Sequence, residues 1–429
     1  MLRTKKQDIK EEKKPIPKSS QKEEYIQPEI NIGLVGHVDH GKTSLVKALT
    51  SKWADTHSEE LKKGITIRLG YADASFYKCP SCGKYGISKK CKCGKEAELL
   101  RRVSFIDAPG HETLMATMLS GAAIMDGAIL LVAANEKCPQ PQTREHIMAL
   151  EIVGIKNIVI AQNKIDLVSD EKALENYNQI KDFVKGTIAE NAQIIPISAQ
   201  HNINIDILIK SIEENIKTPQ RNDKDNPLMY IVRSFDINKP GSKIENLTGG
   251  VLGGALKKGV LKKDEEIEIR PGIKFEKEGR FIWKSLKTKI ISLKSGGSDI
   301  DTVKSGGSIG VLTLLDPSII KSDQLTGNVL GLKDKLPDVW QSFTLKPCLL
   351  KRVVGTKEEL NVGPIKKLEP LMLNVNSSLS IGFVDDLKKD IIHVNLKLPV
   401  CCFKEDRVTI SRRFGDRWRL IGYAEIMDK

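Results

Sequence analysis

The chain has 429 residues, of which 40% are hydrophobic and 29% are charged. This length allows about two to four domains with hydrophobic cores, and the composition is typical of a water-soluble globular protein. It contains no apolar run of about 18 residues, which argues against a membrane-spanning helix and a membrane partner. Residues 1–28 mix lysine with glutamate and contain no apolar signal segment, so they are predicted to form a disordered tail.

The net charge and the cysteine content indicate the kind of partner and the redox compartment of the protein. The formal net charge is +13, which favours an anionic partner such as nucleic acid. The positive charge is spread widely, however, and lysine-rich surfaces also occur on proteins that bind no nucleic acid. Eight cysteines are present, four of them at metal-ligand spacing, and this usage indicates a reducing, cytoplasmic environment.

The segment INIGLVGHVDHGKTSLVKAL predicts a strand, a loop and a helix. Its loop fits the phosphate-binding pattern G-x-x-x-x-G-K-[ST]. Gly36 and Gly41 permit the tight turns that aim backbone N–H groups at phosphate oxygens. Lys42 is expected to reach the outer phosphates and Thr43 to bind Mg²⁺, while a helix from about Lys42 adds the positive end of its dipole. Asp39 could contact a water molecule or a second cation.

Two short stretches farther along are expected to respond to the γ-phosphate. In KKGITIRLG, Thr66 is a candidate second protein ligand of Mg²⁺, the alternative being an ordinary strand threonine. In VSFIDAPGH, a strand ends at Asp107, which can hold Mg²⁺ through water, and the N–H of Gly110 can meet the γ-phosphate. His111 follows directly, either to position the attacking water or as a helix-start residue with no catalytic role.

Between these two stretches, KCPSCGKYGISKKCKCG (residues 78–94) holds a C-x-x-C pair and a C-x-C pair. Four thiolates suit a tetrahedral Zn²⁺ site, and a site closed by four cysteines is structural. The predicted zinc ligands are Cys79, Cys82, Cys91 and Cys93. The alternatives are a metal-free loop or disulfides, which would need an oxidising compartment. The basic stretch GKYGISKK reads either as a solvated loop or as an RNA contact. The other four cysteines show no ligand spacing and are predicted to be packed thiols.

Two later strands are expected to end at the base of the nucleotide. IVIAQNKID places Asn163, Lys164 and Asp166 after one strand, and IIPISAQ places Ser198 and Ala199 after the next. A carboxylate at Asp166 can accept hydrogen bonds from N1–H and the 2-amino group of guanine, a pair that adenine lacks. Backbone N–H groups of the second loop can meet the guanine oxygen. The four motifs in this order predict a GTP site.

The remainder of the chain predicts two further domains. After a last helix within residues 201–217 comes a polar, proline-bearing linker, and then short alternating runs with glycine-rich turns that are typical of β-barrels. The expected architecture is an α/β P-loop GTPase domain with a zinc-knuckle insertion, followed by two all-β barrels. The predicted domains are residues 29–218 for GTP binding, 225–335 for the first barrel and 336–429 for the second.

GHVDHGKT, GITI, DAPGH and NKID together resemble the translational GTPases, which have a G domain followed by two β-barrels. MLSGAAIMDGAILLVAANEKCPQPQTREH, RSFDINKPG, GGVLGG, LDPSIIKSD and RRFGDRWRLIGYAEI are very similar to the γ subunits of archaeal and eukaryotic translation initiation factor 2. The resemblance implies a slow GTPase that needs stimulation by a partner. It would carry methionylated initiator tRNA to the small ribosomal subunit with its mRNA. It would also join α and β subunits, with α on the second domain and β on the G domain.

The resemblance also implies roles for individual residues. The nucleotide-binding positions would be Val38, Asp39, His40, Gly41, Lys42, Thr43, Ser44, Gly110, Asn163, Lys164, Asp166, Ser198, Ala199 and Gln200. The magnesium site would involve Thr43, Thr66, Asp107, Asp39 and Gly64, and the catalytic candidates are His111 and Asp39. Ser44 departs from the threonine common in relatives, and Gln200 stands at a position where only the backbone is needed. The arginines of the last strands could meet tRNA phosphates or form solvated barrel surface; they are Arg412, Arg413, Arg417 and Arg419.

Three other classes of protein share parts of this pattern. Elongation factor Tu and the selenocysteine-specific factor share the carrier layout, but the cysteine insertion and CPQPQTREH argue against them. The GTPase partner of sulfate adenylyltransferase shares the phosphate loop and barrels and would bind no tRNA. In a zinc-ribbon RNA-binding module with an incidental GTPase, removing zinc would abolish RNA binding and exchanging GTP for GDP would not matter.

Overall fold

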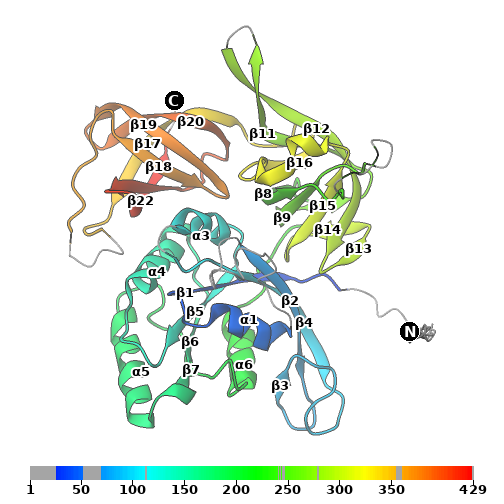
Figure 1. The fold of residues 1–429 in the computed structure, drawn as a ribbon, viewed down its shortest axis with the longest axis vertical. Helices are drawn as coiled ribbons and strands as arrows, with labels where there is room; N and C mark the ends of the chain where they lie inside the picture. The colour runs from blue at the N-terminus through cyan, green and yellow to red at the C-terminus, as the bar shows by residue number, and fades with distance from the viewer. Residues whose placement is uncertain are drawn as a thin grey trace, which may run out of the picture.

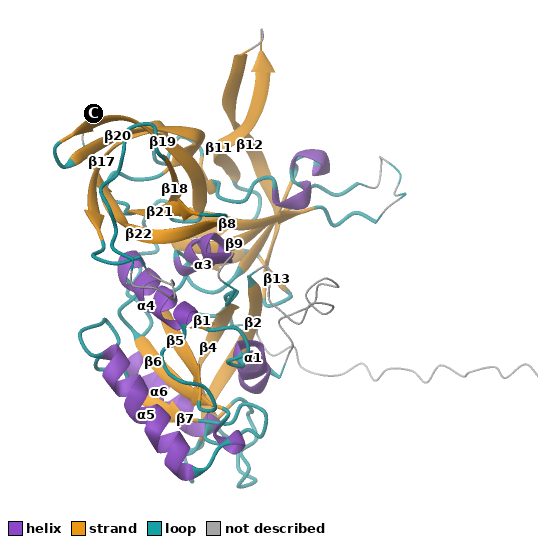
Figure 2. Cartoon of the chain, turned by 60° about the vertical axis from the view of Figure 1, so that its left-hand side comes forward, coloured by secondary structure: helices purple, strands orange, loops and turns teal. Residues whose placement is uncertain are grey.

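The computed structural model describes residues 26–51, 69–111, 114–239, 241, 243, 247–277, 280–353 and 360–427. One α/β unit carries two β-barrels on its upper side (Figure 1), and all the longer helices belong to the α/β unit (Figure 2). The predicted fold class is therefore confirmed. The predicted magnesium positions Thr66 and Gly64 lie outside the described residues, as do residues 1–25 of the predicted tail. Within the described part, no helix is both long and apolar enough to cross a membrane.

The α/β unit is built on a seven-stranded sheet of order β3-β2-β4-β1-β5-β6-β7. Its strands are β1 (Ile30–Gly36), β2 (Gly70–Lys78), β3 (Tyr85–Gly86), β4 (Glu98–Asp107), β5 (Gly127–Ala133), β6 (Ile158–Asn163) and β7 (Ile194–Pro196). Strands β4, β1, β5, β6 and β7 are mutually parallel, whereas β2 is antiparallel to β4. Every residue of β1, β5 and β6 is buried, because helices cover both faces of the parallel part.

Two groups of helices cover this sheet. They are α1 (Lys42–Thr50), α3 (Met115–Ala122), α4 (Pro141–Val153), α5 (Asp170–Val184) and α6 (Ile205–Asn215), with a short 3-10 helix η2 (Ile165–Leu167). Helices α1 and α6 pack on one face, and α3, α4 and α5 pack on the other. Pro141 starts α4 with a preset φ, and Gly154 ends it with a φ of 89°. The carboxyl ends of β1, β4, β6 and β7 meet at one edge, where open α/β sheets bind ligands.

The first barrel follows the α/β unit. Its strands are β8 (Leu228–Phe235), β9 (Val251–Lys258), β10 (Val260–Lys262), β11 (Glu266–Lys277), β12 (Arg280–Ser295), β13 (Ser298–Ile300), β14 (Thr302–Lys304), β15 (Ile309–Thr313) and β16 (Val329–Leu332), with two 3-10 turns, η4 (Pro317–Ile319) and η5 (Lys321–Asp323). The strand order is β11-β16-β8-β9-β15-β12-β13, and pairing of β11 with β12 closes the ring. The far ends of β11 and β12 project from the barrel as a ribbon (Figure 1).

The second barrel is closed by six strands in the order β17-β20-β19-β18-β21-β22. They are β17 (Val339–Leu349), β18 (Pro370–Val375), β19 (Ser378–Lys388), β20 (Ile391–Cys401), β21 (Val408–Phe414) and β22 (Arg417–Ile426). Cys401 and Cys402 are packed thiols, as is Cys138 in the α/β unit, but Cys348 is exposed. The prediction that Cys348 is packed is therefore wrong, because the outer face of β17 is not covered at that position.

The three units are joined by contacts as well as by the chain. One apolar cluster runs from α3, α4 and α5 into both barrels, where it includes Tyr230 and Leu420. The predicted linker is not free: Arg221 donates to the Asp126 carboxylate at 2.6 Å and to the Glu29 carbonyl at 2.6 Å. Gln27, which the sequence placed at the end of the tail, donates to the Lys304 carbonyl at 2.7 Å. The two Arg221 bonds therefore tie the linker to the α/β unit, and the Gln27 bond ties the segment before β1 to the first barrel.

Candidate nucleotide site and cysteine knuckle

The phosphate loop joins β1 to α1 as the sequence predicts. Gly41 lies directly before α1 with a φ of 89°, in the left-handed region that favours glycine. The Lys42 ammonium lies across the loop and donates to the carbonyls of Gly36 at 2.9 Å and His37 at 2.8 Å. A cation at the N-terminus of a helix, inside a turn of backbone, is the arrangement that binds phosphate oxygens.

Two neighbouring residues of the phosphate loop, His40 and Asp39, differ in burial. The imidazole of His40 is fully buried, and its Nδ1 lies 2.9 Å from the Leu131 carbonyl. Burial lowers the pKa of His40 to about 3, so the ring is neutral, and only its backbone is left to face a phosphate. Asp39 is exposed at a φ of 62°. Unlike the side chain of His40, the side chain of Asp39 is therefore open to solvent and ions.

Two of the oxygen donors predicted for Mg²⁺, those of Thr43 and Asp107, come together at this site. The Thr43 hydroxyl donates to the Asp107 carboxylate at 2.7 Å, and hydroxyl and carboxylate oxygens suit Mg²⁺. Gly110 lies so close to the Lys42 ammonium and the Gly36 carbonyl that a side chain there would collide with them. The peptide after Asp107 is therefore in contact with the phosphate loop, and the half-buried His111 follows it.

The loops after β6 and β7 are tied to the phosphate loop through one amide. Asn163 donates to the His40 carbonyl at 2.9 Å and accepts from the Ala199 N–H at 3.0 Å. Its side chain is thus engaged with backbone groups and aligns the two base loops. Lys164 precedes η2 with a φ of 64°. The two bonds of Asn163 explain why an amide, which can donate and accept at once, suits position 163.

The carboxylate predicted to select guanine has a neighbour that the sequence analysis missed. The exposed imidazole of His201 lies with Nε2 at 3.6 Å from the Asp166 carboxylate. A guanine that bound this carboxylate would share it with His201 or displace it. His201 directly follows Gln200 in the second base loop, and this position in the sequence could have indicated that it lies near the base.

The cysteine knuckle lies between β2 and β4 and includes β3. The four sulfur atoms lie within 4.8 Å of one another, and the pairs Cys79–Cys93 and Cys82–Cys91 are each 3.6 Å apart. Tetrahedral zinc with Zn–S bonds of about 2.3 Å requires sulfur atoms about 3.8 Å apart. The donor set therefore fits Zn²⁺.

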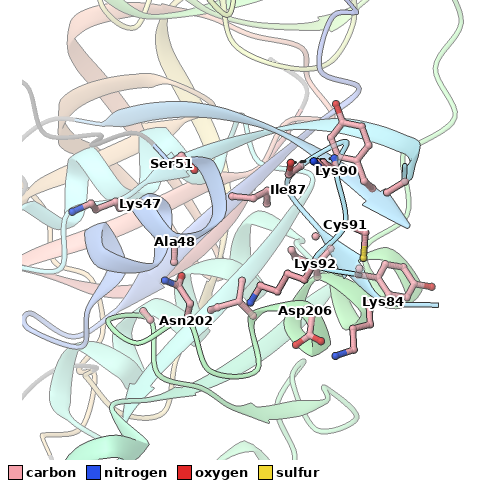
Figure 3. Close-up of a pocket in the computed structure, with 18 of the residues that line it drawn as sticks. Lys47, Ala48, Ser51, Lys84, Ile87, Lys90, Cys91, Lys92, Asn202 and Asp206 are labelled. Carbon is pink, nitrogen blue, oxygen red and sulfur yellow. Dashed lines mark hydrogen bonds between the residues drawn. The ribbon is translucent and has the colours of Figure 1, made fainter. Parts of the chain in front are cut away.

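The knuckle also forms one wall of a cavity of about 670 Å³ (Figure 3). The opposite walls are α1 and α6, and the cavity extends to the second base loop. Its lining includes the apolar side chains of Ile87, Ile205 and Ile209 and the charged side chains of Lys84 and Lys92. The insertion thus extends the α/β core and places positive charge beside the base loops.

Comparison with known proteins identifies the family. The family model of the elongation factor Tu GTP-binding domain matches residues 27–218, and that of the initiation factor eIF2 gamma C-terminal domain matches residues 341–426. Translation initiation factor 2 subunit gamma of Pyrococcus horikoshii is 59% identical over 403 residues, covering 94% of this chain and 98% of that protein. The chain belongs to the translation initiation factor 2 gamma family. The Methanocaldococcus jannaschii member is 59% identical over 408 residues, covering 95% and 99% of the two chains.

Solved structures agree with this fold. Elongation factor SelB of Methanococcus maripaludis bound to a GTP analogue has a TM-score of 0.69 at 22% identity, covering 94% of this chain and 80% of that chain. Bacterial selenocysteine-specific elongation factor has a TM-score of 0.70 at 22% identity, covering 94% and 58%. Such identities show a shared fold alone. The initiation factor 2 gamma relatives make this chain a translational GTPase of initiation and favour that class over the elongation-factor and sulfate-enzyme alternatives.

Two arginines of this gamma-family chain are not solvated barrel surface. Arg419 is buried at 6% exposure and donates to the Glu145 carboxylate of α4 at 2.7 Å. Arg412 pairs with Glu369 within its own barrel. For Arg419, both readings drawn from the sequence are therefore wrong, because the α/β unit covers that part of β22. Arg413 and Arg417 remain at the exposed turn between β21 and β22.

Proposed function

We propose that this protein is the GTP-dependent carrier of methionylated initiator tRNA to the small ribosomal subunit. In this role it is the core of a heterotrimeric initiation factor. The observation that carries the proposal is the 59% identity to initiation factor 2 gamma subunits along 94% of the chain. The assembled phosphate and base loops support a GTP-dependent switch. We further propose that intrinsic hydrolysis is slow, and that the protein acts in the cytoplasm.

The residue roles follow the positions of the side chains. Lys42 and the loop N–H groups hold the phosphates, and Asp166 selects guanine. Thr43 and Asp107 hold Mg²⁺, which supplies charge neutralisation at the phosphates when it is bound. His111 positions the attacking water, and Asp39 provides an accessible carboxylate at the loop. Zn²⁺ on the four knuckle cysteines supports the wall of the cavity in Figure 3.

The domains and partners form a further part of the proposal. The GTP-binding domain spans residues 29–218, and the barrels span 225–335 and 336–429. Helix α6 ends at Asn215, β8 begins at Leu228 and β17 begins at Val339, which supports these divisions. We place the α subunit on the first barrel and the β subunit on the G domain. The acceptor end of the tRNA lies between the G domain and the first barrel.

Binding of charged tRNA tests the proposal directly. The Mg²⁺-loaded protein is titrated with methionylated initiator tRNA, once with a GTP analogue and once with GDP. A pool of charged elongator tRNAs is the comparison, at one fixed salt concentration because phosphate contacts make affinity salt-dependent. Tighter binding of the initiator in the GTP-analogue state is expected. Equal binding of elongator tRNAs, or no tRNA binding even with an α subunit added, would contradict the carrier role.

A further inference from the structure

A buried histidine of α4 holds the first peptide of the phosphate loop. The Gly36 N–H donates to Nδ1 of His146 at 2.8 Å, although 110 residues separate the two in the chain. His146 is 1% exposed. Burial lowers its pKa to about 3, so the ring is neutral at physiological pH. Since Nδ1 accepts the bond, the ring proton lies on Nε2.

The other side of Gly36 is held by the phosphate-binding lysine. Its carbonyl accepts from the Lys42 ammonium at 2.9 Å. Gly36 has a φ of 146°, and a side chain there would meet the Leu131 carbonyl. The two peptides that flank Gly36 are therefore oriented by His146 on one side and by Lys42 on the other. A movement of His146 would therefore shift the Lys42 ammonium and the loop N–H groups relative to a bound phosphate.

Helix α4 is fixed in turn by the second barrel. The residue next to His146, Glu145, accepts from Arg419 of β22 at 2.7 Å, with side-chain exposures of 2% and 7%. Near the other end of α4, the Ile152 carbonyl accepts from Arg407 at 3.3 Å. Helix α4 thus contacts the phosphate loop through His146 and the second barrel through the adjacent residue, Glu145.

We propose that His146 is a positioning residue for the bound guanine nucleotide, and that the second barrel sets its position through the Glu145–Arg419 pair. The barrel then controls how long the G domain retains GDP or GTP. A partner that pulls or presses on this barrel changes nucleotide release without touching the nucleotide. The inference rests on GTP binding by the family and stands independently of the tRNA-carrier role.

The first test compares two substitutions of the histidine in the full chain. His146→Leu removes the acceptor, whereas His146→Asn keeps an oxygen near the position of Nδ1. Release of a fluorescent GDP analogue is measured by stopped flow with excess Mg²⁺ and unlabelled GDP. We expect His146→Leu to release GDP about tenfold faster, the factor that matches one lost buried hydrogen bond. His146→Asn restores most of the slow release. Equal rates in the Leu variant and the parent, or in the Leu and Asn variants, would overturn the positioning role.

The second test asks whether the barrel acts through the histidine. Arg419→Met breaks the bond to α4, and Arg412→Met is its matched control, because Arg412 pairs with Glu369 inside the same barrel. We expect faster GDP release from Arg419→Met and a parental rate from Arg412→Met. The double variant with His146→Leu should be no faster than His146→Leu alone, since the two changes act on one connection. Equal effects of both arginine variants, or additive effects in the double variant, would refute the coupling. Where His146→Leu does not fold, the two arginine variants still test whether the contact between the barrel and α4 controls GDP release, and equal release rates in the two would refute that control.

Discussion

Asp166 is the side chain predicted to distinguish guanine from adenine. Asp166→Asn exchanges an acceptor for a donor where guanine presents N1–H and its 2-amino group. We expect GTP affinity to fall about 10- to 100-fold, the effect of losing hydrogen bonds to a charged group, while xanthine nucleotides gain. Competition of GTP and xanthosine triphosphate for a fluorescent GDP analogue measures this. Asp170→Asn, at the exposed start of α5, is the control, and an unchanged GTP preference in Asp166→Asn would contradict the assignment.

Buried histidines at the phosphate loop predict how stability depends on pH. Burial lowers the folded-state pKa of His40 to about 3, against an ordinary value of 6.5. Between these values the unfolded chain binds a proton that the folded chain does not, so stability falls as pH falls. The slope is about 1.4 kcal/mol per pH unit for one such histidine.

His40→Asn isolates this contribution, because its amide can still donate to the Leu131 carbonyl. Chemical denaturation of parent and variant is compared from about pH 6 down to about pH 4, inside the interval where His40 differs between the two states. The variant is expected to lose stability less steeply, by about 1.4 kcal/mol per pH unit. Parallel curves for the two proteins would show that His40 takes up a proton in the folded state.

At the scale of an element, the knuckle predicts a metal content. Cys82→Ser removes one of four ligands, and Cys348→Ser alters a cysteine that is also exposed but lies in the second barrel. Elemental analysis should find about one zinc per chain in the parent and in Cys348→Ser, and much less in Cys82→Ser. GTP binding should persist in all three proteins, because the phosphate loop lies outside the knuckle. A zinc-free parent prepared with zinc present would disprove the site.

At the scale of the whole molecule, Asp126 connects the G domain to the first barrel. Its carboxylate accepts from Arg221 at 2.6 Å, from the Asn31 N–H at 2.9 Å, and lies 3.7 Å from the Lys257 ammonium. Because these groups are largely buried, Asp126→Asn leaves positive charge without its partner and should lower the unfolding free energy by about 3 kcal/mol.

Thermal and chemical unfolding measure this loss. Asp182→Asn is the control, because its pair with Lys185 has side-chain exposures of 72% and 65%, and exposed pairs contribute about 1 kcal/mol or less. Equal stability of the two variants would mean that the ion pairs of Asp126 do not hold the first barrel against the G domain.

Much of the site was predictable because its conformations are set by neighbouring residues. Gly41 before Lys42 allows a left-handed turn that aims N–H groups at one point, and this needs no distant contact. The cysteine spacing likewise determines a four-sulfur cluster, since two short turns bring the thiols together. Alternating strands with glycine turns sufficed to predict both barrels. In each case the periodicity or spacing of nearby residues restricts the backbone to few choices.

The contacts between distant parts of the chain were decided only by the tertiary structure. The bond from Gly36 to His146 spans 110 residues, and that from Glu145 to Arg419 spans 274. Alternation in β22 shows which side chains leave the strand, but it cannot show that α4 covers one of them. Cys348 was misjudged for the same reason, since burial depends on what packs against a strand. The sequence by itself determined the motifs and the domain types, whose physics is local. Which helix holds the phosphate loop, and which barrel holds that helix, depends on packing between units far apart in the chain.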